Sequence, residues 1–441
     1  MGRIAMLSVH SCPLAALGGK ETGGMNVYIR ELSRSLAERG CTVDIFTRSQ
    51  NPRVPVVVPF CEDVRIVHLK AGPESPYEKS RAWSHLPEFL DNLEQFRRGE
   101  DISYSLIHSH YWLSGWVGAE LGKRWNVPLL HMFHTVGYFK NRATQAVGAQ
   151  EPEVRLQVEQ QLIADADHIT VSSQREKVDM IWTYGAPPEK ITVVPCGVDT
   201  QMFRPLDATA SKNHLGLPDK KLILFVGRID PVKGIDTLLK AMVMVRKKMG
   251  GSLNARLLIV GGDKDSTDYS EDSEIARLKR LTAKLNIQDT VTFLGSQRQD
   301  LLPYYYSAAE MCILPSRYES FGMVALEAMS CGTPVIASKV GGLTSLIQDE
   351  RCGFVVPEGN ERALTEKICL LLGNPALRET LGWHARERAT QYGWHAIADR
   401  ILALYRTLSE GGIDDAQLLL PFCRKTGTDT AAPVITCCEA C

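Results

Sequence analysis

Short apolar runs alternate with amphipathic segments along the first half of the chain. One such segment, residues 26–39, has the spacing of a helix and is ended by Gly40. Nearly continuous apolar runs of about four to eight residues between helices are typical of a parallel sheet covered on both faces. The strands that this pattern predicts are residues 4–9, 42–47, 65–70, 106–108, 129–133, 169–172 and 191–195.

The alternation restarts after Phe203-Arg204-Pro205 and a polar stretch at residues 207–213, which we interpret as a hinge. In this half the pattern predicts a helix at residues 234–249. The predicted strands are residues 222–226, 257–260, 291–294, 312–314, 335–337 and 354–356. Two successive βα series predict an α/β fold of two doubly wound, Rossmann-like domains that bind ligands at the carboxyl ends of their strands.

The length supports two domains, because 441 residues exceed the size of one typical core. We assign residues 1–205 to an N-terminal domain and residues 206–393 to a second domain. A predicted helix at residues 394–410 packs back on the first domain. Residues 411–441 are expected to form a disordered tail.

Composition narrows the classes of function. Fifty basic against 51 acidic residues give a net charge of −1, which provides no electrostatic basis for binding nucleic acid or an anionic membrane. No apolar run approaches the roughly 20 residues of a membrane span, and the N-terminus lacks an apolar signal segment. The twelve cysteines follow no disulfide pattern, so we expect reduced thiols and a cytoplasmic location.

Candidate chemistry is densest in the sequence ESFGMVALEA, which begins at Glu319. Backbone N–H groups around Phe321, Gly322 and Met323 would point out of a helix N-terminus, where a phosphate binds well. The flanking carboxylates of Glu319 and Glu327 could accept hydrogen bonds from vicinal hydroxyls of a sugar or a ribose. The segment indicates a sugar–diphosphate–ribose ligand, with two helix-capping carboxylates as the alternative.

Two further features follow predicted strands. Arg228 and Lys233, in GRIDPVKG, could neutralise a diphosphate leaving group at a strand end, or could be solvated surface cations. A glycine-rich turn at residues 18–24 could admit a phosphate or serve turn geometry alone, since it matches neither GxGxxG nor a P-loop.

Four histidines also lie at strand ends, namely His108, His110, His131 and His134. Two histidines separated by one residue on a strand share a face, which could suggest a metal. No nearby cysteine or carboxylate completes a ligand set, so we expect no metal site.

Together, ESFGMVALEA, GRIDPVK, the GGMN loop and HYWLSGW resemble the retaining family 4 glycosyltransferases, which have the GT-B fold of two Rossmann-like domains facing a central cleft. The resemblance covers residues 3–408. It is greatest to the branch that acts on inositol phosphate, followed by the sucrose-phosphate and sucrose synthases. The latter typically carry Gly-Gly-Gln where this chain has Gly24-Met25-Asn26, which favours the inositol type.

The resemblance implies roles on the donor side of the cleft. The catalytic positions that it implies are His134, Arg228, Lys233 and Glu319. It assigns the diphosphate to Arg228 and Lys233, the ribose to Glu327, the transferred sugar to Glu319 with the amides of Phe321, Gly322 and Met323, and the uracil to the segment Gln297-Arg298. His134 matches an active-site histidine beside the donor sugar.

On the acceptor side, the positions that match are Gly23, Asn26, Lys79, Tyr111, Thr135 and Arg155. Lys79 and Arg155 would supply charges for a phosphate, and the Gly23 amide would add a neutral donor. Residues 74–78 and 137–140 depart from the inositol-type pattern, which leaves the acceptor open.

The resemblance implies metal-independent, retaining transfer of a hexose or N-acetylhexosamine from a UDP-sugar, or a related nucleotide sugar, to a small phosphorylated polyol or sugar such as inositol phosphate. Two alternatives stay open: a sucrose-phosphate synthase-like enzyme that uses fructose 6-phosphate, and a non-catalytic sugar-nucleotide binder. The missing GxGxxG disfavours a nucleotide-dependent oxidoreductase. No cofactor beyond the nucleotide sugar is expected, and a homodimer is an open alternative to a monomer.

Overall fold

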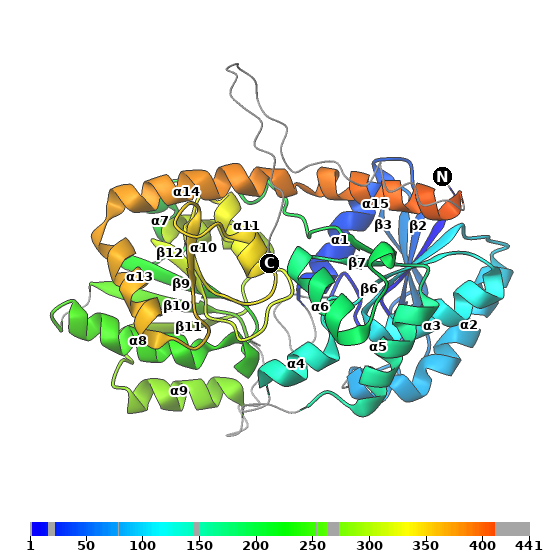
Figure 1. The fold of residues 1–441 in the computed structure, drawn as a ribbon, viewed down its shortest axis with the longest axis horizontal. Helices are drawn as coiled ribbons and strands as arrows, with labels where there is room; N and C mark the ends of the chain where they lie inside the picture. The colour runs from blue at the N-terminus through cyan, green and yellow to red at the C-terminus, as the bar shows by residue number, and fades with distance from the viewer. Residues whose placement is uncertain are drawn as a thin grey trace, which may run out of the picture.

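Two parallel-stranded lobes lie side by side along the long axis of the molecule (Figure 1). The computed structural model describes residues 2–15, 23–77, 79–144, 150–251, 254–262 and 273–410. Strands of the first sheet lie between residues 4 and 193, and those of the second between residues 221 and 356. The predicted α/β fold with two doubly wound sheets is confirmed.

The first sheet has eight strands in the order β3-β4-β2-β1-β5-β6-β7-β8. They are β1 Ile4–Leu7, β2 Val43–Arg48, β3 Val57–Cys61, β4 Val64–Leu69, β5 Leu106–His110, β6 Leu129–Met132, β7 His168–Val171 and β8 Ile191–Val193. Every pairing is parallel except that of β3 with β4. The central strands are buried along their whole length, which explains why plain apolar runs predict them.

The edge strand β3 is absent from the sequence prediction. Its side chains are partly or largely exposed, and it contains Pro59, which cannot donate to a ladder and is tolerated at an edge. All five of its residues are apolar, but Pro59 interrupts the run, and a proline within a run counts against a strand. Apolar content alone therefore does not define this border of the sheet.

The second sheet has six strands in the order β11-β10-β9-β12-β13-β14, all paired in parallel. They are β9 Lys221–Val226, β10 Ala255–Val260, β11 Val291–Gly295, β12 Met311–Leu314, β13 Val335–Ser338 and β14 Gly353–Val356. The strand order reverses between β9 and β12, which are neighbours in the sheet but not in the chain. In open α/β sheets, such a reversal opens a crevice for ligands at the carboxyl ends of the strands.

Helices cover both faces of each sheet (Figure 1). In the first lobe these are α1 Gly24–Ala37, α2 Leu86–Gly99, α3 Tyr111–Trp125, α4 Gly137–Thr144, α5 Glu153–Asp165 and α6 Gln174–Tyr184. The others are α7 Ala208–His214, α8 Ile235–Lys248, α9 Glu274–Lys284, α10 Leu302–Ala308, α11 Met323–Ser330, α12 Leu343–Leu346, α13 Glu361–Gly373, α14 Pro375–Ala389 and α15 Trp394–Ser409. Short 3-10 helices are η1 Lys79–His85, η2 Pro188–Lys190, η3 Pro231–Lys233, η4 Gln299–Leu301 and η5 Thr390–Tyr392.

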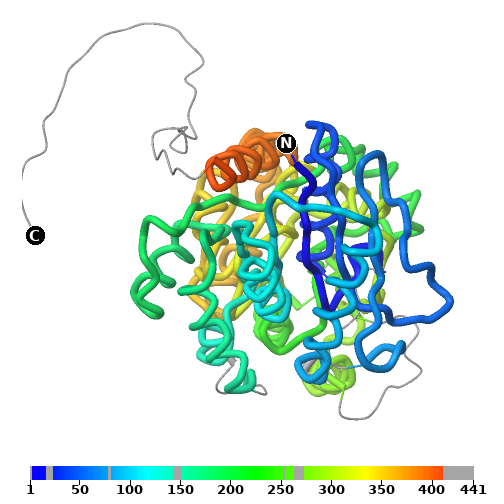
Figure 2. The backbone as a smooth tube through the Cα atoms, turned by 90° about the vertical axis from the view of Figure 1, so that its right-hand side faces the viewer, coloured from blue at the N-terminus to red at the C-terminus, as the bar shows by residue number. Residues whose placement is uncertain are grey.

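The final helix of the described chain returns to the first lobe. After α14 the chain crosses from the second lobe, and α15 lies along α1 near the amino terminus (Figures 1 and 2). The Tyr405 hydroxyl lies 2.7 Å from Nδ1 of His108, and Arg39 forms an ion pair with Asp399 at 2.5 Å. Apolar side chains of α1 and α15 belong to one continuous core. The two ends of the described chain are thereby tied together.

The described helices include none that is long and apolar enough to span a membrane. Each cysteine within the described ranges is a free thiol. The predicted C-terminal tail, residues 411–441, lies outside the described residues, as do Gly18 and Gly19 of the glycine-rich turn.

Candidate active site

A pocket of about 330 Å³ lies between the two lobes, where the carboxyl ends of both sheets face each other. The first lobe contributes lining residues from the loop after β1, the start of α1 and the loop after β6. The second lobe contributes the loops after β9, β11 and β12 and the start of α11. Among the residues that sequence reasoning assigns to a site, those that line the pocket are Gly23, Asn26, Tyr111, His134, Thr135, Arg228, Lys233, Gln297, Glu319, Phe321, Gly322, Met323 and Glu327.

The start of α11 presents backbone amides to the pocket. Its N-cap, Gly322, has φ of 101°, a left-handed conformation that favours glycine. A Cβ at this position would also lie 2.5 Å from Leu343 Cδ2, so no larger residue fits without a shift. Because the first N–H groups of a helix have no partner within it, the backbone N–H groups of residues 321–323 are suited to binding an anion.

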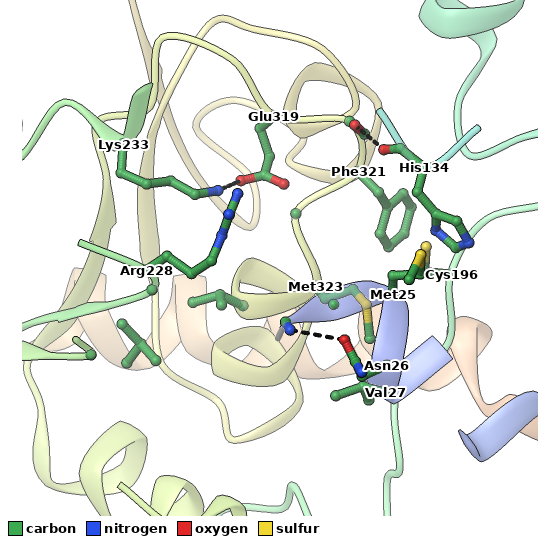
Figure 3. Close-up of a pocket in the computed structure, with 18 of the residues that line it drawn as sticks. Met25, Asn26, Val27, His134, Cys196, Arg228, Lys233, Glu319, Phe321 and Met323 are labelled. Carbon is green, nitrogen blue, oxygen red and sulfur yellow. Dashed lines mark hydrogen bonds and ion pairs between the residues drawn. The ribbon is translucent and has the colours of Figure 1, made fainter. Parts of the chain in front are cut away.

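An ion pair lies directly beside these amides. Lys233 Nζ is 2.5 Å from Glu319 Oε2, and both side chains are mostly buried. Figure 3 shows the Arg228 guanidinium directed toward the same carboxylate. Two cations and one carboxylate thus share the wall of the pocket, as the spacing of the sequence motifs predicts. The arrangement carries one net positive charge, which suits a ligand with more than one negative charge.

Glu327 occupies a drier part of the same wall. Its residue is 8% exposed, and Oε2 accepts a hydrogen bond of 2.8 Å from the Tyr306 hydroxyl. Burial raises the pKa of the Glu327 carboxyl to about 7, and the Tyr306 hydrogen bond opposes this rise. Ionised Glu327 can therefore accept hydrogen bonds from ligand hydroxyls, but ionising a buried carboxyl costs free energy of desolvation.

The structure does not bring the Arg298 side chain into the pocket. It is 80% exposed and forms an ion pair of 2.7 Å with Asp300. Its neighbours Ser296, Gln297 and Gln299 line the pocket instead. At this segment the residues on either side of Arg298, and not its own side chain, are therefore placed to meet a ligand.

On the opposite wall, Asn26 is used within the protein. Its Oδ1 accepts a hydrogen bond from Gly23 N at 3.2 Å, and its Nδ2 donates to Ser11 Oγ and to Cys12 O, both at 2.8 Å. Asn26 thus fixes the entry into α1 while only 1% exposed. The start of α1, with Met25 and Asn26, lies opposite Met323 at the start of α11 (Figure 3).

His134 lies at the border between the two walls and has φ of 58°. Its Nε2 is 3.0 Å from Nδ1 of His110, and its carbonyl oxygen accepts a 2.5 Å hydrogen bond from the Ser320 hydroxyl. Burial lowers the pKa of His134 to about 3, so the ring is neutral at physiological pH. The ring can donate or accept a hydrogen bond at a ligand, but it is not a cation.

The other strand-end histidines serve packing. His108 pairs with Tyr405, and His131 lies 2.8 Å from Ser109 Oγ. In the part of the chain that the structure describes, no three His, Cys, Asp or Glu side chains are grouped to hold a metal ion.

Arg155 lies behind the pocket rather than in it. The residue is 1% exposed, with ion pairs to Glu159 at 2.6 Å and Glu151 at 2.9 Å. It also donates to the Tyr111 hydroxyl at 2.9 Å and to the Thr135 carbonyl at 2.7 Å. Two carboxylates already compensate its charge, so in this geometry Arg155 positions Tyr111 and Thr135. Lys79 begins η1, and its side chain lies outside the described residues.

Sequence reasoning missed several lining residues. Lys140 of α4 lines the pocket and forms an ion pair with Glu151 at 2.6 Å. Tyr318 and Ser320 flank Glu319 and reach across to the first lobe, and Cys196 contributes a buried thiol. Lys140 follows a strand-end histidine motif, which is a signal that could have identified it. Cys196 carries no such signal.

Two family models together match most of the chain. Glycosyltransferase Family 4 matches residues 22–202, and Glycosyl transferases group 1 matches residues 207–388. D-inositol 3-phosphate glycosyltransferase of Kineococcus radiotolerans is 39% identical over 416 residues, which is 92% of this chain and 95% of that protein. The protein of the same name from Saccharomonospora viridis is 38% identical over 92% of this chain and 94% of its own length.

Solved structures are similar over the same span. Sucrose-phosphate synthase from Thermosynechococcus elongatus superposes with a TM-score of 0.85 at 38% identity, covering 93% of this chain and 100% of that one. The Anabaena protein HepE, in complex with UDP and glucose, has a TM-score of 0.72 at 18% identity, covering 92% and 100%. The second likeness supports the fold alone.

Proposed function

The chain belongs to the family 4 glycosyltransferases and is a hexosyltransferase of GT-B fold, and from this premise we propose that it transfers a hexose or N-acetylhexosamine from a UDP-sugar to a small phosphorylated polyol of the inositol phosphate type. One observation carries the donor class. The Lys233–Glu319 ion pair and the amides of the α11 N-terminus lie in one pocket with Arg228.

Each part of the donor would bind to a different set of these groups. Arg228, Lys233 and the α11 amides would bind the diphosphate and stabilise it as the leaving group. Glu319 would accept a hydrogen bond from a hydroxyl of the transferred sugar, and Glu327 would hold the ribose. Because these contacts are fixed before reaction, they stabilise the developing negative charge without reorganisation.

No side chain in this scheme acts as a strong base. His134 is neutral and held by His110, so it would orient the donor sugar rather than carry a proton. With retention, the acceptor hydroxyl would attack from the side of the leaving group and pass its proton to the departing phosphate oxygen. Closure of the two lobes would exclude water and limit hydrolysis of the donor.

The charges on the protein also support a reaction without a metal. Lys233 and Arg228 would supply positive charge at the diphosphate that a divalent cation supplies elsewhere. We expect turnover to be unchanged by EDTA and not stimulated by added Mg²⁺. A loss of activity in EDTA that Mg²⁺ restores would contradict this part of the proposal.

The acceptor class rests on relatives and on one cation. The similar proteins with 38–39% identity are named for D-inositol 3-phosphate. Lys140 lies in the pocket beside Tyr111 and Thr135, where it could face an acceptor phosphate. Fructose 6-phosphate is a second candidate, because the superposed sucrose-phosphate synthase is 38% identical to this chain.

A panel of acceptors tests the proposal. The purified protein is incubated with UDP-glucose or UDP-N-acetylglucosamine and either D-inositol 3-phosphate, fructose 6-phosphate or the unphosphorylated compounds, and UDP release is measured. We expect release with inositol phosphate and none with free inositol. Release with fructose 6-phosphate alone would favour the second candidate. Binding of the UDP-sugar without release of UDP in the presence of any acceptor would overturn the enzymatic proposal and favour a non-catalytic binder. A homodimer stays a prediction.

A further inference from the structure

The loop that carries Glu319 is attached to the first lobe through its neighbour Ser320. The Ser320 hydroxyl donates to the carbonyl of His134 at 2.5 Å (Figure 3). In the opposite direction, the Ser320 carbonyl accepts a hydrogen bond from the Ser172 hydroxyl at 3.1 Å. Both bonds connect lobes that are far apart in sequence. They therefore hold a donor-site loop of the second lobe against the first.

The Ser172 hydroxyl has a second, closer acceptor. Glu176 Oε2 lies 2.6 Å from Ser172 Oγ and 2.9 Å from Ser172 N. A hydroxyl carries one proton, so it can be donated to Glu176 or to Ser320, but not fully to both. An ionised carboxylate is the stronger acceptor, and the shorter distance agrees with that preference.

We infer that Glu176 and Ser172 are positioning residues for the donor site, and that the protonation state of Glu176 decides whether Ser172 bonds to the Ser320 loop. When Glu176 is ionised, the Ser172 proton points to the carboxylate, and the Ser320 carbonyl loses its donor from the first lobe. When Glu176 is protonated, it donates to Ser172 Oγ, and the Ser172 proton turns to Ser320. The inference rests on the proposed function, because it assigns a pH dependence to nucleotide binding.

The surroundings place this exchange near neutrality. Desolvation raises the pKa of Glu176 to about 7, the hydrogen bonds from Ser172 oppose the rise, and Asp179 of the same helix adds to it. Cys196 and Tyr318 face Glu176 from the loops after β8 and β12. Burial raises the pKa values of both Cys196 and Tyr318, so neither changes charge near neutral pH.

Two other groups lie close to this cluster. Burial lowers the pKa of His134 to about 3, so its ring is neutral across the same range. Asp179 forms an ion pair with Arg175 at 2.9 Å. The proton that enters Glu176 comes from solvent and returns to it, and no bond other than O–H is made or broken.

The sign of the effect follows directly. Protonation of Glu176 adds the Ser172–Ser320 hydrogen bond, which holds the donor-site loop against the first lobe. The affinity for a nucleotide at the donor site should therefore increase as pH falls through about 7. One neutral hydrogen bond corresponds to a change in affinity of roughly fivefold. The effect would lie in the KM for the nucleotide sugar more than in kcat, because the chemical groups are unchanged.

Calorimetric titration with UDP tests this without any acceptor. The dissociation constant is measured at about pH 6 and about pH 8, on either side of the Glu176 pKa. The β-phosphate of UDP titrates near pH 6 itself, so each result is read relative to Glu176→Gln, whose amide donates to Ser172 at every pH. We expect wild-type affinity relative to this variant to fall roughly fivefold from the lower to the higher pH.

Further variants separate positioning from folding. Ser172→Ala should bind roughly fivefold more weakly than wild type at the lower pH and equally at the higher pH. Ser172→Thr keeps the hydroxyl and should restore the wild-type profile. Glu189→Gln changes an exposed carboxylate on η2 and should leave the profile unchanged.

The outcomes distinguish the two proposals. A pH dependence in Glu176→Gln equal to that of wild type, or a Ser172→Ala protein equal to wild type at the lower pH, would overturn the positioning role alone. Failure of wild-type protein to bind UDP at either pH would overturn both the positioning role and the proposed donor.

Discussion

Gly24 and Met323 approach each other across the pocket so closely that a Cβ on Gly24 would lie 3.2 Å from Met323 Sδ. Each residue opens a helix, α1 in the first lobe and α11 in the second. Because Gly24 has no side chain, the Met323 side chain lies directly against the start of α1. A larger side chain at position 24 would have to displace Met323 or separate the two helix starts.

Gly24→Leu should separate the two helix starts. A branched side chain cannot fit beside Met323, and displacement by about 1 Å in an active site costs tenfold to hundredfold in rate. We expect a fall of that order in kcat/KM with little change in melting temperature, since the site lies at a helix start. Gly24→Ala is the control and should cost much less, because the flexible Met323 side chain can move by a few tenths of an ångström.

Lys233→Met should remove both a diphosphate contact and the partner of Glu319. Losing one preorganised charge at a leaving group costs about 10²–10³ in kcat, or roughly 3–4 kcal/mol. Steady-state kinetics with saturating acceptor measures the change. Lys240→Met is the matched control, because Lys240 pairs with Glu361 on the surface of α8 at 3.0 Å. Unchanged turnover in Lys233→Met would rule out the diphosphate role.

Glu327→Gln should change how stability depends on pH. The pKa of Glu327 rises from 4.5 to about 7 on folding, so the folded state binds this proton more tightly. The stabilisation is full below pH 4.5 and is lost as pH rises through 7. The uncharged variant should therefore exceed wild type by about 1–3 kcal/mol at alkaline pH and match it under acid conditions.

Thermal unfolding at several pH values measures that difference. The same variant should bind UDP more weakly, because an amide oxygen is a poorer acceptor for ribose hydroxyls than a carboxylate. Equal stability curves for the two proteins at all pH values would show that Glu327 is not desolvated.

Arg155→Leu should destabilise the fold as well as lower activity. The substitution leaves Glu159 without its buried cation, while Glu151 keeps Lys140, and breaking a buried pair costs about 3–5 kcal/mol. Chemical denaturation measures the loss. Arg362→Leu removes an exposed pair with Glu366 at the same helical spacing and should cost less than about 0.5 kcal/mol. An Arg155 variant of wild-type stability with weakened acceptor binding would instead support a direct phosphate contact.

Arg298→Ala should leave the enzyme nearly unchanged. The side chain is exposed and paired with Asp300 among the described residues, so its removal should affect neither the pocket wall nor the core. We expect kcat/KM for the UDP-sugar to stay within about twofold of wild type, since exposed ion pairs contribute little. A large rise in KM would show that Arg298 turns inward when the donor binds.

The sequence predicts this fold well because most strands are buried on both faces. Each predicted strand agrees with an observed one to within two residues at either end. The exception, β3, is apolar along its length but lies at a half-exposed edge and contains Pro59, which counts against a strand in the sequence pattern. Parallel strands also place their carboxyl ends at one edge, so motifs after β9 and β12 were expected to meet, and Lys233 and Glu319 do.

Side-chain direction and charge compensation were harder to predict. A position at a strand end does not show which way a long side chain turns, and Arg298 turns toward Asp300 and solvent. For Arg155, glutamates four residues before and after it were a signal that its charge would be neutralised within the protein. The Ser172–Ser320 bond joins segments 148 residues apart, and no local pattern reveals it.

The return of α15 to the first lobe sets the order in which the molecule can be completed. Ile397, Ile401 and Tyr405 fill the same core as Tyr28 and Leu32 of α1. During synthesis, the ribosome releases α1 hundreds of residues before α15 exists, and domains generally fold as the chain emerges. The apolar face of the first lobe that α15 covers therefore stays exposed until the whole second lobe has been translated. A chain that stops before Trp394 would contain both sheets, but the core of the first lobe would lack the side chains of α15.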